Sequence, residues 1–366
     1  MTIAKIAVWD FRVPFRDGSY AMSHVTQEVI FGRILQVCMV DGKKGLGEIV
    51  FPPSLPEQAR QDLISDEENY LADMIGKEAA DLILLAGELR DRGHAWGAVA
   101  FGLETAAFDL LGQERGCLVS ACLGGAQMES VADYFSISER NIEDIQARVS
   151  LAGSDRQVIQ LKLGIGSLDD DADQIDAALD AMSSGQILLA DANGGWTVEE
   201  ARELISRFDD PRIVWEEPAR SYEENTEVAK HTNRPVMVDQ CVGEISIARR
   251  AIDEGYVSSL CIKPAFLGGL TVAREVRDYC TERGMTMRID GPWCGDIATA
   301  AILHLAVGAP TSMLMAGCDL REPLEIDSDL KGVIDKGSTR IAPPTGVGLG
   351  VTLPDGALGE VEAVYR

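Results

Sequence analysis

The sequence lacks the features that would place this chain in a membrane or in an oxidising compartment. No apolar run reaches the roughly 20 residues needed to cross a bilayer. The eight cysteines include no C-x-x-C pair and mostly lie in apolar contexts, which is typical of reduced cysteines and not of a disulfide framework or a zinc site. The chain starts at Met1 with a strand-like alternation and without the regions of a secretory signal. We therefore expect a soluble cytoplasmic protein.

Positive charge is also scarce. The 366 residues include 33 Lys and Arg against 59 Asp and Glu, which gives a formal net charge of -26. Nucleic acids and anionic membrane surfaces attract basic proteins, so this balance argues against both as partners. It does not indicate a cationic substrate, because solvated surface carboxylates are the commoner cause. We expect a small-molecule carboxylate substrate and a homo-oligomer.

The first 125 residues combine two kinds of pattern. Alternating residues over 3–13, 27–40 and 46–50, with a turn at 41–45, predict an antiparallel meander. Irregular loops are expected at 15–26 and 51–56. Helical periodicity then runs from about Glu57 to Gln113, with breaks near Gly76 and at 92–93. An α+β domain is predicted over 1–125.

From Val131 the chain repeats a strand and a helix at roughly 25-residue spacing, as in α/β barrels. Eight strands are predicted, ending near Ser136, Lys162, Asp191, Glu216, Asp239, Lys263, Asp290 and Ala316. An open doubly wound sheet is the alternative, but it would normally show a Gly-rich phosphate turn after its first strand, and this sequence has none. We predict an α/β fold with a modified TIM barrel of seven or eight units over 126–342. A Gly- and Pro-rich tail, 343–366, is expected to return to the N-terminal domain.

Three successive predicted strands end in carboxylates. The run ILLADANGGW supplies Asp191 with Asn193, IVWEEP supplies Glu216 and Glu217, and RPVMVDQ supplies Asp239. A single acid in such a place is more often a solvated loop residue or a helix cap. Three acids that each end a successive strand indicate that their side chains converge at the barrel mouth. Hard oxygen ligands of this kind suit Mg²⁺. The pattern alone does not decide which of the two adjacent glutamates points inward.

Two lysines end the predicted strands on either side of these acids. Lys162 belongs to the second strand and Lys263 to the sixth, and these positions face each other across a closed barrel. Such a pair can remove the α-proton of a carboxylate substrate and return it, or assist loss of a β-substituent, while a metal stabilises the enediolate. Each lysine alone could equally be a surface residue. A Schiff base on Lys263, as in an aldolase-type barrel, is the alternative from another mechanistic class.

These motifs resemble the mandelate racemase and muconate lactonizing enzyme family of the enolase superfamily. ETAAFDLLGQ at 104–113 with Leu-Gly-Gly at 123–125 looks like its N-terminal signature, and Asp191-x-Asn193 leading to WEEP at 215–218 is similar to its second signature. The resemblance implies an N-terminal capping domain and an Mg²⁺ cofactor. It implies the ligands Asp191, Glu216 and Asp239, and so favours Glu216 over Glu217. The position of Lys263 resembles the muconate lactonizing enzyme subgroup.

Two positions depart from the family pattern. Gln160 replaces the first lysine of the usual Lys-x-Lys, and Gln240 replaces the acid that commonly follows Asp239. The segments DGSYAMS at 17–23 and DGPWCGDI at 290–297 look like members that act on proline-type substrates, which include hydroxyproline dehydratases and hydroxyproline betaine epimerases. Trp293 could cover a cationic ring nitrogen, a contact worth on the order of 1 kcal/mol, or could simply pack at the start of a helix.

We therefore predict an isomerase or lyase, an Mg-dependent racemase or epimerase or a dehydratase acting on a proline-type amino acid. Lys162 and Lys263 are the expected acid/base pair. The candidate substrate-binding residues are Tyr20, Ser23, Gln160, Asn193, Asp290, Trp293 and Asp319. Asp290 and Asp319 could instead cap helices. A sugar-acid dehydratase, a dipeptide epimerase and a cycloisomerase remain alternatives within the family, and the loops 15–26 and 51–56 would decide among them.

Overall fold

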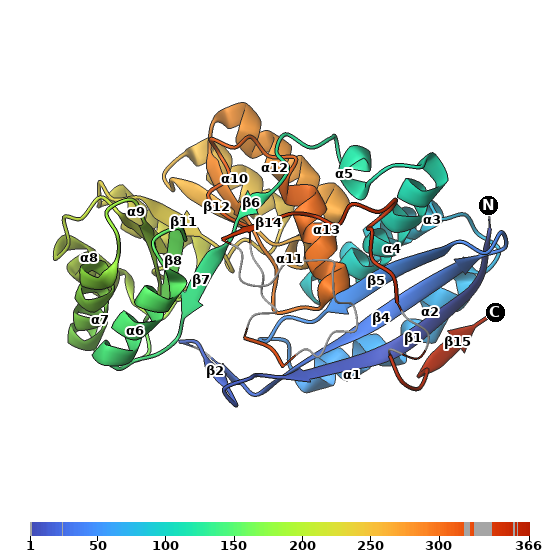
Figure 1. Cartoon of the computed structure of the whole chain (residues 1–366), viewed down its shortest axis with the longest axis horizontal. Helices are drawn as coiled ribbons and strands as arrows, with labels where there is room; N and C mark the ends of the chain where they lie inside the picture. Colours follow the sequence, from blue (N-terminus) through green and yellow to red (C-terminus); the bar gives the residue numbers. More distant parts are fainter. Residues whose placement is uncertain (1, 24, 318–322, 326–338, 354–355, 357) are drawn as a thin grey trace.

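In a computed structural model, an antiparallel sheet with its own helices packs beside a parallel barrel (Figure 1). The structure describes residues 2–23, 25–317, 323–325, 339–353, 356 and 358–366. Asp319 lies outside these ranges. The seven cysteines within them are free thiols. In this described part, no helix is long and apolar enough to span a bilayer.

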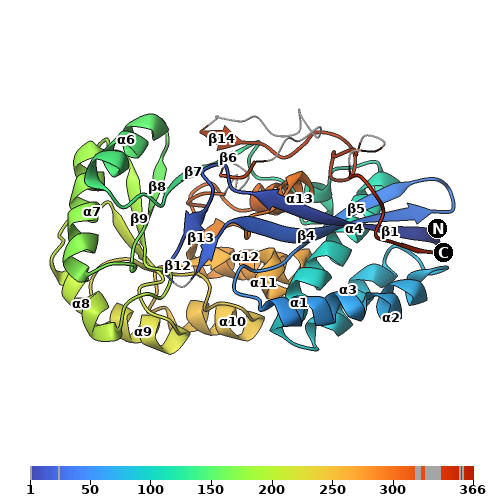
Figure 2. The same cartoon turned by 90° about the horizontal axis from the view of Figure 1, so that it is seen from below.

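The N-terminal sheet has the strand order β15-β1-β4-β5. Strands β1 (Ile3–Pro14), β4 (Val29–Met39) and β5 (Lys44–Val50) form the antiparallel meander, and β2 (Tyr20–Ala21) with β3 (Thr26–Gln27) forms a small hairpin in the loop between β1 and β4. Strand β15 (Ala363–Tyr365) pairs antiparallel with β1. Both ends of the chain therefore lie at this sheet (Figure 2).

Helices cover one face of this sheet. They are α1 (Glu57–Ser65), α2 (Glu67–Leu71), η1 (Ala72–Met74), α3 (Asp81–Arg90), η2 (His94–Trp96) and α4 (Gly97–Arg115). The short helix α5 (Val119–Cys122) packs against α4. Helix α4 is buried almost all round. It approaches β5 so closely that a Cβ at Gly47 would lie 2.1 Å from the carbonyl oxygen of Gly102. This close approach explains why both positions are glycine.

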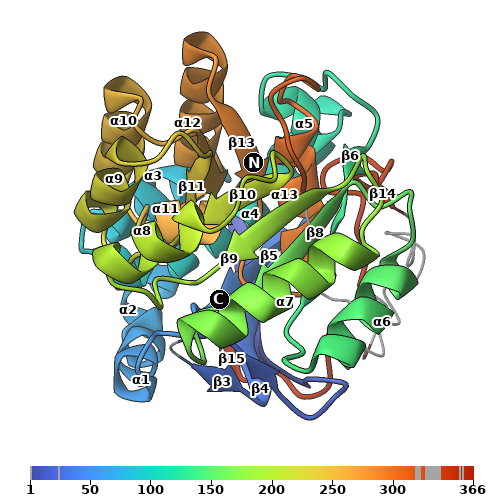
Figure 3. The ribbon, with the colours of Figure 1, turned by 90° about the vertical axis from the view of Figure 1, so that its left-hand side faces the viewer.

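Seven parallel strands form the barrel sheet in chain order. They are β7 (Tyr134–Ile137), β8 (Val158–Lys162), β9 (Ile187–Asp191), β10 (Ile213–Glu216), β11 (Val236–Val238), β12 (Ser259–Ile262) and β13 (Thr286–Ile289). The helices between and after them are α6 (Ile142–Ala152), α7 (Leu168–Ala181), α8 (Val198–Ser206), α9 (Tyr222–Lys230), α10 (Ile245–Glu254), α11 (Pro264–Leu267), α12 (Leu270–Arg283) and α13 (Asp296–Ala306). Figure 3 shows the helices around the outside of the strands.

The eighth predicted strand is an irregular segment, 313–317. Its Met315 N–H donates to Met287 of β13 at 2.8 Å, and the N–H of Gly317 donates to Ala132 at 2.8 Å. Ala132 belongs to the short strand β6 (Val131–Ala132), which pairs with β14 (Arg340–Ile341) just before β7. The segment therefore joins the two edges of the sheet. The predicted α/β barrel with an N-terminal α+β part is confirmed.

Two buried glutamates of the N-terminal part cap the N-termini of helices in the barrel. Glu48 on β5 accepts backbone N–H groups from Gly295 and Ala298, at 2.5 and 2.9 Å, at the start of α13. Glu104 on α4 accepts the N–H of Thr271, at 2.7 Å, at the start of α12. The first N–H groups of a helix have no partner within the helix, so a carboxylate there satisfies them and complements the helix dipole.

Candidate active site

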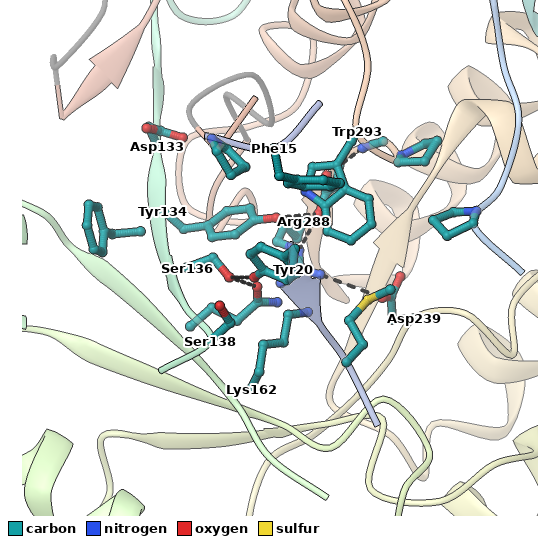
Figure 4. Close-up of a pocket in the computed structure, with 18 of the residues that line it drawn as sticks. Phe15, Tyr20, Asp133, Tyr134, Ser136, Ser138, Lys162, Asp239, Arg288 and Trp293 are labelled. Atoms are coloured by element: carbon teal, nitrogen blue, oxygen red, sulfur yellow. Dashed lines mark hydrogen bonds and ion pairs between the residues drawn. The ribbon is translucent and has the colours of Figure 1, made fainter. Parts of the chain in front are cut away.

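A cavity of about 780 Å³ lies where the barrel meets the N-terminal loops (Figure 4). Loops before β4 and after β5 supply Phe15, Tyr20, Met22 and Pro53 to its wall. The barrel supplies Ser136, Gln160, Lys162, Asp239, Lys263, Arg288, Asp290 and Trp293. Most of the predicted site residues therefore share one cavity.

Tight turns position the acids at the strand ends. After Asp191, the backbone of Asn193 adopts a left-handed conformation with φ 46°. Its N–H and its side-chain amide both donate to Asp191, at 2.9 and 3.0 Å. Helix α8 then begins with a reciprocal cap between Thr197 and Glu200. The same type of cap begins α7 and α9, so each strand end is fixed against a well-defined helix start.

Lys162 forms a buried ion pair with Asp191. The distance from Nζ to Oδ2 is 2.6 Å, and Asp191 is fully buried. Burial disfavours the charged amine, but attraction to Asp191, Tyr20 and Glu216 outweighs it and raises the pKa of Lys162 to about 12. Burial next to Glu216 raises the pKa of Asp191. Lys162 is therefore an ammonium ion in this arrangement.

Lys263 forms the corresponding pair on the other side of the cavity. It caps the short helix α11 just after β12, and its Nζ lies 2.6 Å from Oδ2 of Asp239. Burial acts against the ammonium form, but Asp239 and other neighbours outweigh it, so the pKa of Lys263 is raised. Lys162 belongs to β8 and Lys263 follows β12, four positions along the strand order. In a ring closed by 313–317, these positions face each other.

Glu216 is held by Arg288 and Gln160. The Arg288 guanidinium binds both carboxylate oxygens of Glu216, with Nη1 2.8 Å from Oε2. The Gln160 amide donates to Glu216 at 2.9 Å and to Asp191 at 3.1 Å. Gln160, at the position where the family pattern has a lysine, thus bridges two of the predicted metal ligands.

Glu217 points to a different set of partners. Its backbone is left-handed, with φ 42°, which turns its side chain away from that of Glu216. Its carboxylate accepts the backbone N–H of Asp239 and, at 2.8 Å, that of Cys241. Burial and the neighbouring Asp239 charge raise the pKa of Glu217 to about 8. Glu217 therefore shapes the loop after β11.

Two sets of hydrogen-bonded side chains line the side of the cavity nearest β7. Tyr20 bonds through its hydroxyl to Ser136 at 2.5 Å, and Ser136 donates to Gln160 at 2.9 Å. Tyr134 donates to Asp290 at 3.0 Å. Ser23, another predicted binding residue, instead donates its hydroxyl to the backbone carbonyl of Asn193 at 2.9 Å.

Three aromatic rings gather at the cavity wall. The centre of the Trp293 ring lies 4.9 Å from the ring centres of Phe15 and of Tyr20, and its contact with Phe15 is edge-to-face. Val13, Met22, Ile30 and Leu324 complete this cluster. Trp293 is mostly buried, so it both packs against the N-terminal loop and contributes to the wall.

The donor chemistry of the acids fits a hard divalent cation. Asp191, Glu216 and Asp239 offer only carboxylate oxygens, and they end three neighbouring strands. Among the described residues, no donor reaches the buried Oδ1 atoms of Asp239 and Asn193. In that same part of the chain, no three acidic, histidine or cysteine side chains are arranged so that they could hold a metal ion as they stand. The amines, guanidinium and amide described above already contact the three acids.

Sequence reasoning missed Arg288, Tyr134 and Ser136. Arg288 interrupts the apolar strand TMRI and lies two residues before Asp290, so both side chains point into the barrel. A charged residue within a buried strand was the signal that could have identified it. Tyr134 and Ser136 lie on β7 with the same alternation, but neither has a distinctive sequence signal.

The chain is similar to several known proteins over most or all of its length. Residues 143–357 match the model of the family described as enolase C-terminal domain-like. A cis-3-hydroxy-L-proline dehydratase of Roseibium aggregatum is 29% identical over 378 residues, covering all of both chains. A mandelate racemase/muconate lactonizing enzyme crystal structure from Roseovarius nubinhibens superposes with a TM-score of 0.87 at 27% identity and covers 100% of this chain and 98% of that one. An enolase superfamily member from the same organism, complexed with magnesium, gives 0.88 at 25% identity over 100% and 99%.

Proposed function

The chain belongs to the enolase C-terminal domain-like family, and from this membership we propose that it is a magnesium-dependent enzyme that removes the α-proton of a carboxylate substrate. The products would be an epimer or a dehydrated acid. The observation that supports this most directly is the placement of Lys162 and Lys263, which line one cavity from facing positions of the barrel. A proton can then leave one face of a carbon and return to the other.

Asp191, Glu216 and Asp239 would hold the metal. When bound, a divalent cation supplies charge that stabilises an enediolate and lowers the pKa of a nearby amine. Lys162 and Lys263 would then take and give the proton at the α-carbon. A Schiff base on Lys263, the alternative mechanism, would be trapped by borohydride as a substrate adduct.

We propose a proline-type amino acid as the substrate. The relative from Roseibium aggregatum is a cis-3-hydroxy-L-proline dehydratase, although 29% identity leaves room for another substrate. The aromatic cluster around Trp293 offers a ring surface, and Asp290 lines the same cavity. Together they suit the cationic nitrogen of a proline or a proline betaine.

Incubation with hydroxyprolines and proline betaines in D₂O with Mg²⁺ tests the proposal. We expect deuterium at the α-carbon, or a dehydrated product that carries solvent deuterium. Lys162→Met and Lys263→Met should each lower turnover by 10²–10⁴-fold, roughly the usual contribution of general acid–base catalysis. The exposed Lys77→Met is the matched control. Exchange that persists in the double lysine variant would refute the assignment of the bases.

A further inference from the structure

Arg288 lies buried among the carboxylates of the site. It projects from β13, is 1% exposed, and lies between Tyr134 and Asp239 in Figure 4. Besides its two bonds to Glu216, its Nη2 is 3.9 Å from Asp239 and its Nε is 3.3 Å from Asp290. The guanidinium carbon lies 5.0 Å from the centre of the Tyr134 ring. One cation thus contacts carboxylates from three different strand ends.

With Arg288 included, every predicted metal ligand is paired with a cation of the chain. Lys162 pairs with Asp191, Arg288 with Glu216, and Lys263 with Asp239. Three buried carboxylates at neighbouring strand ends would repel one another without such compensation. These pairs therefore compensate the negative charge of the three carboxylates.

The pair between Arg288 and Glu216 differs from the two lysine pairs. All three cations line the cavity, but under the proposed function only the lysines act as acid and base. Arg288 engages both oxygens of Glu216 through its fork, which is the strong, geometrically specific form of such a pair. A divalent ion that takes an oxygen of Glu216 must share it with the guanidinium or displace it.

We propose that Arg288 is the resident counter-ion of Glu216 and competes with the divalent metal for it. Metal binding is then an exchange of cations, and the Arg288–Glu216 pair sets the metal affinity. This inference rests on the proposed function, because it takes Glu216 as a ligand. Its physical basis is twofold: Mg²⁺ requires direct oxygen contacts in a strict octahedral geometry, and a guanidinium a few ångströms away repels a second cation in a buried site.

Calorimetric titration of the metal-free protein with Mg²⁺ and with Mn²⁺ tests the proposal without using activity. Arg288→Met removes the competitor, so we expect both metals to bind at least about tenfold more tightly than to the wild type. Arg288→Gln keeps a neutral donor near Glu216, and its affinity should also rise. It serves as the second variant if Arg288→Met does not fold.

Arg33→Met is the matched control. Arg33 is a buried arginine of the N-terminal sheet that pairs with Glu67 at 3.1 Å, so its loss tests the general effect of removing a buried guanidinium. We expect its metal affinity to equal that of the wild type. A second readout is the rise in Tm on adding saturating Mg²⁺, which should be larger for Arg288→Met than for the wild type, because metal replaces the lost counter-ion.

The outcomes separate the two proposals. If the wild type binds metal and Arg288→Met binds it equally or more weakly, Arg288 only orients Glu216 and the competition is refuted. If neither the wild type nor any variant binds Mg²⁺ or Mn²⁺, the metal dependence in the proposed function fails as well. Tighter binding by both Arg288 variants, with Arg33→Met unchanged, would support the competition.

Discussion

The backbone N–H of Asp239 donates a hydrogen bond to the carboxylate of Glu217, so a residue at the end of one strand orients a predicted metal ligand at the end of the next. The same carboxylate also accepts the N–H of Cys241. The left-handed backbone at Glu217 is what allows two adjacent acids to serve different partners.

The first prediction concerns this contact. Glu217→Ala leaves one buried and one partly buried N–H group without an acceptor, so we expect the free energy of unfolding to fall by about 2 kcal/mol and Mg²⁺ affinity to weaken. Urea denaturation and calorimetric titration measure the two effects. The exposed Glu199→Gln on α8 should change neither. Unaltered metal affinity in Glu217→Ala would show that the loop after β11 keeps its shape without this side chain.

The second prediction concerns acid stability. Burial lowers the pKa of His304 on α13 to about 4, although its ring nitrogen lies 3.1 Å from the Leu349 carbonyl. An unfolded histidine titrates near 6.5, so between pH 6.5 and pH 4 the unfolded chain binds a proton that the folded protein does not. His304 therefore costs stability as the pH falls through this window, by up to about 3 kcal/mol.

His304→Gln removes that titration. Between pH 7 and pH 4, the wild type should lose about 3 kcal/mol more of its free energy of unfolding than the variant does. Urea denaturation across this pH range measures the difference. The exposed His231→Gln should not alter the pH dependence in this way. Parallel pH profiles for wild type and His304→Gln would contradict the prediction.

The third prediction concerns metal removal. Without a divalent ion, Lys162 and Lys263 remain ammonium ions in their pairs with Asp191 and Asp239, so neither can accept a proton. EDTA should therefore stop α-proton exchange into D₂O, and added Mg²⁺ should restore it. Elemental analysis of the treated protein confirms that the metal is gone. Exchange that continues in demonstrably metal-free protein would rule out the metal dependence.

The fourth prediction concerns the aromatic cluster. Trp293→Leu should weaken binding of a proline betaine about fivefold, which corresponds to roughly 1 kcal/mol of lost cation–π attraction. Binding of N-acetylproline, which has no cationic nitrogen, should weaken less. Calorimetry with both ligands makes the comparison. Equal losses for the two ligands would mean that Trp293 only shapes the wall through its contacts with Phe15 and Tyr20.

The barrel strands could be predicted from the sequence because each is a short apolar run between polar helices with capping signals. The N-terminal meander was predicted nearly to the residue, with β1 at Ile3–Pro14 and β4 at Val29–Met39. The segment 313–317 was expected to be a full strand. Its apolar residues have the right composition, but strand pairing depends on neighbours that a local pattern does not contain.

A site residue could be predicted from the sequence where it is the last residue of its strand, as Asp191 and Lys162 are. Arg288 could not be placed the same way, because its partner Glu216 lies three strands away and only the curvature of the sheet brings them together. The separate roles of Glu216 and Glu217 depend on one backbone angle. Sequence spacing carries no information about that angle.

The glutamates that begin α12 and α13 have a consequence for how such proteins can be recombined. Glu48 and Glu104 belong to the N-terminal part, yet the helices they start belong to the barrel, and α13 follows the segment that carries Asp290 and Trp293. Consider a chimera in which the N-terminal part comes from a relative that lacks these two acids. The first N–H groups of α12 and α13 would then lose their side-chain acceptors. The two parts should therefore be engineered as one piece.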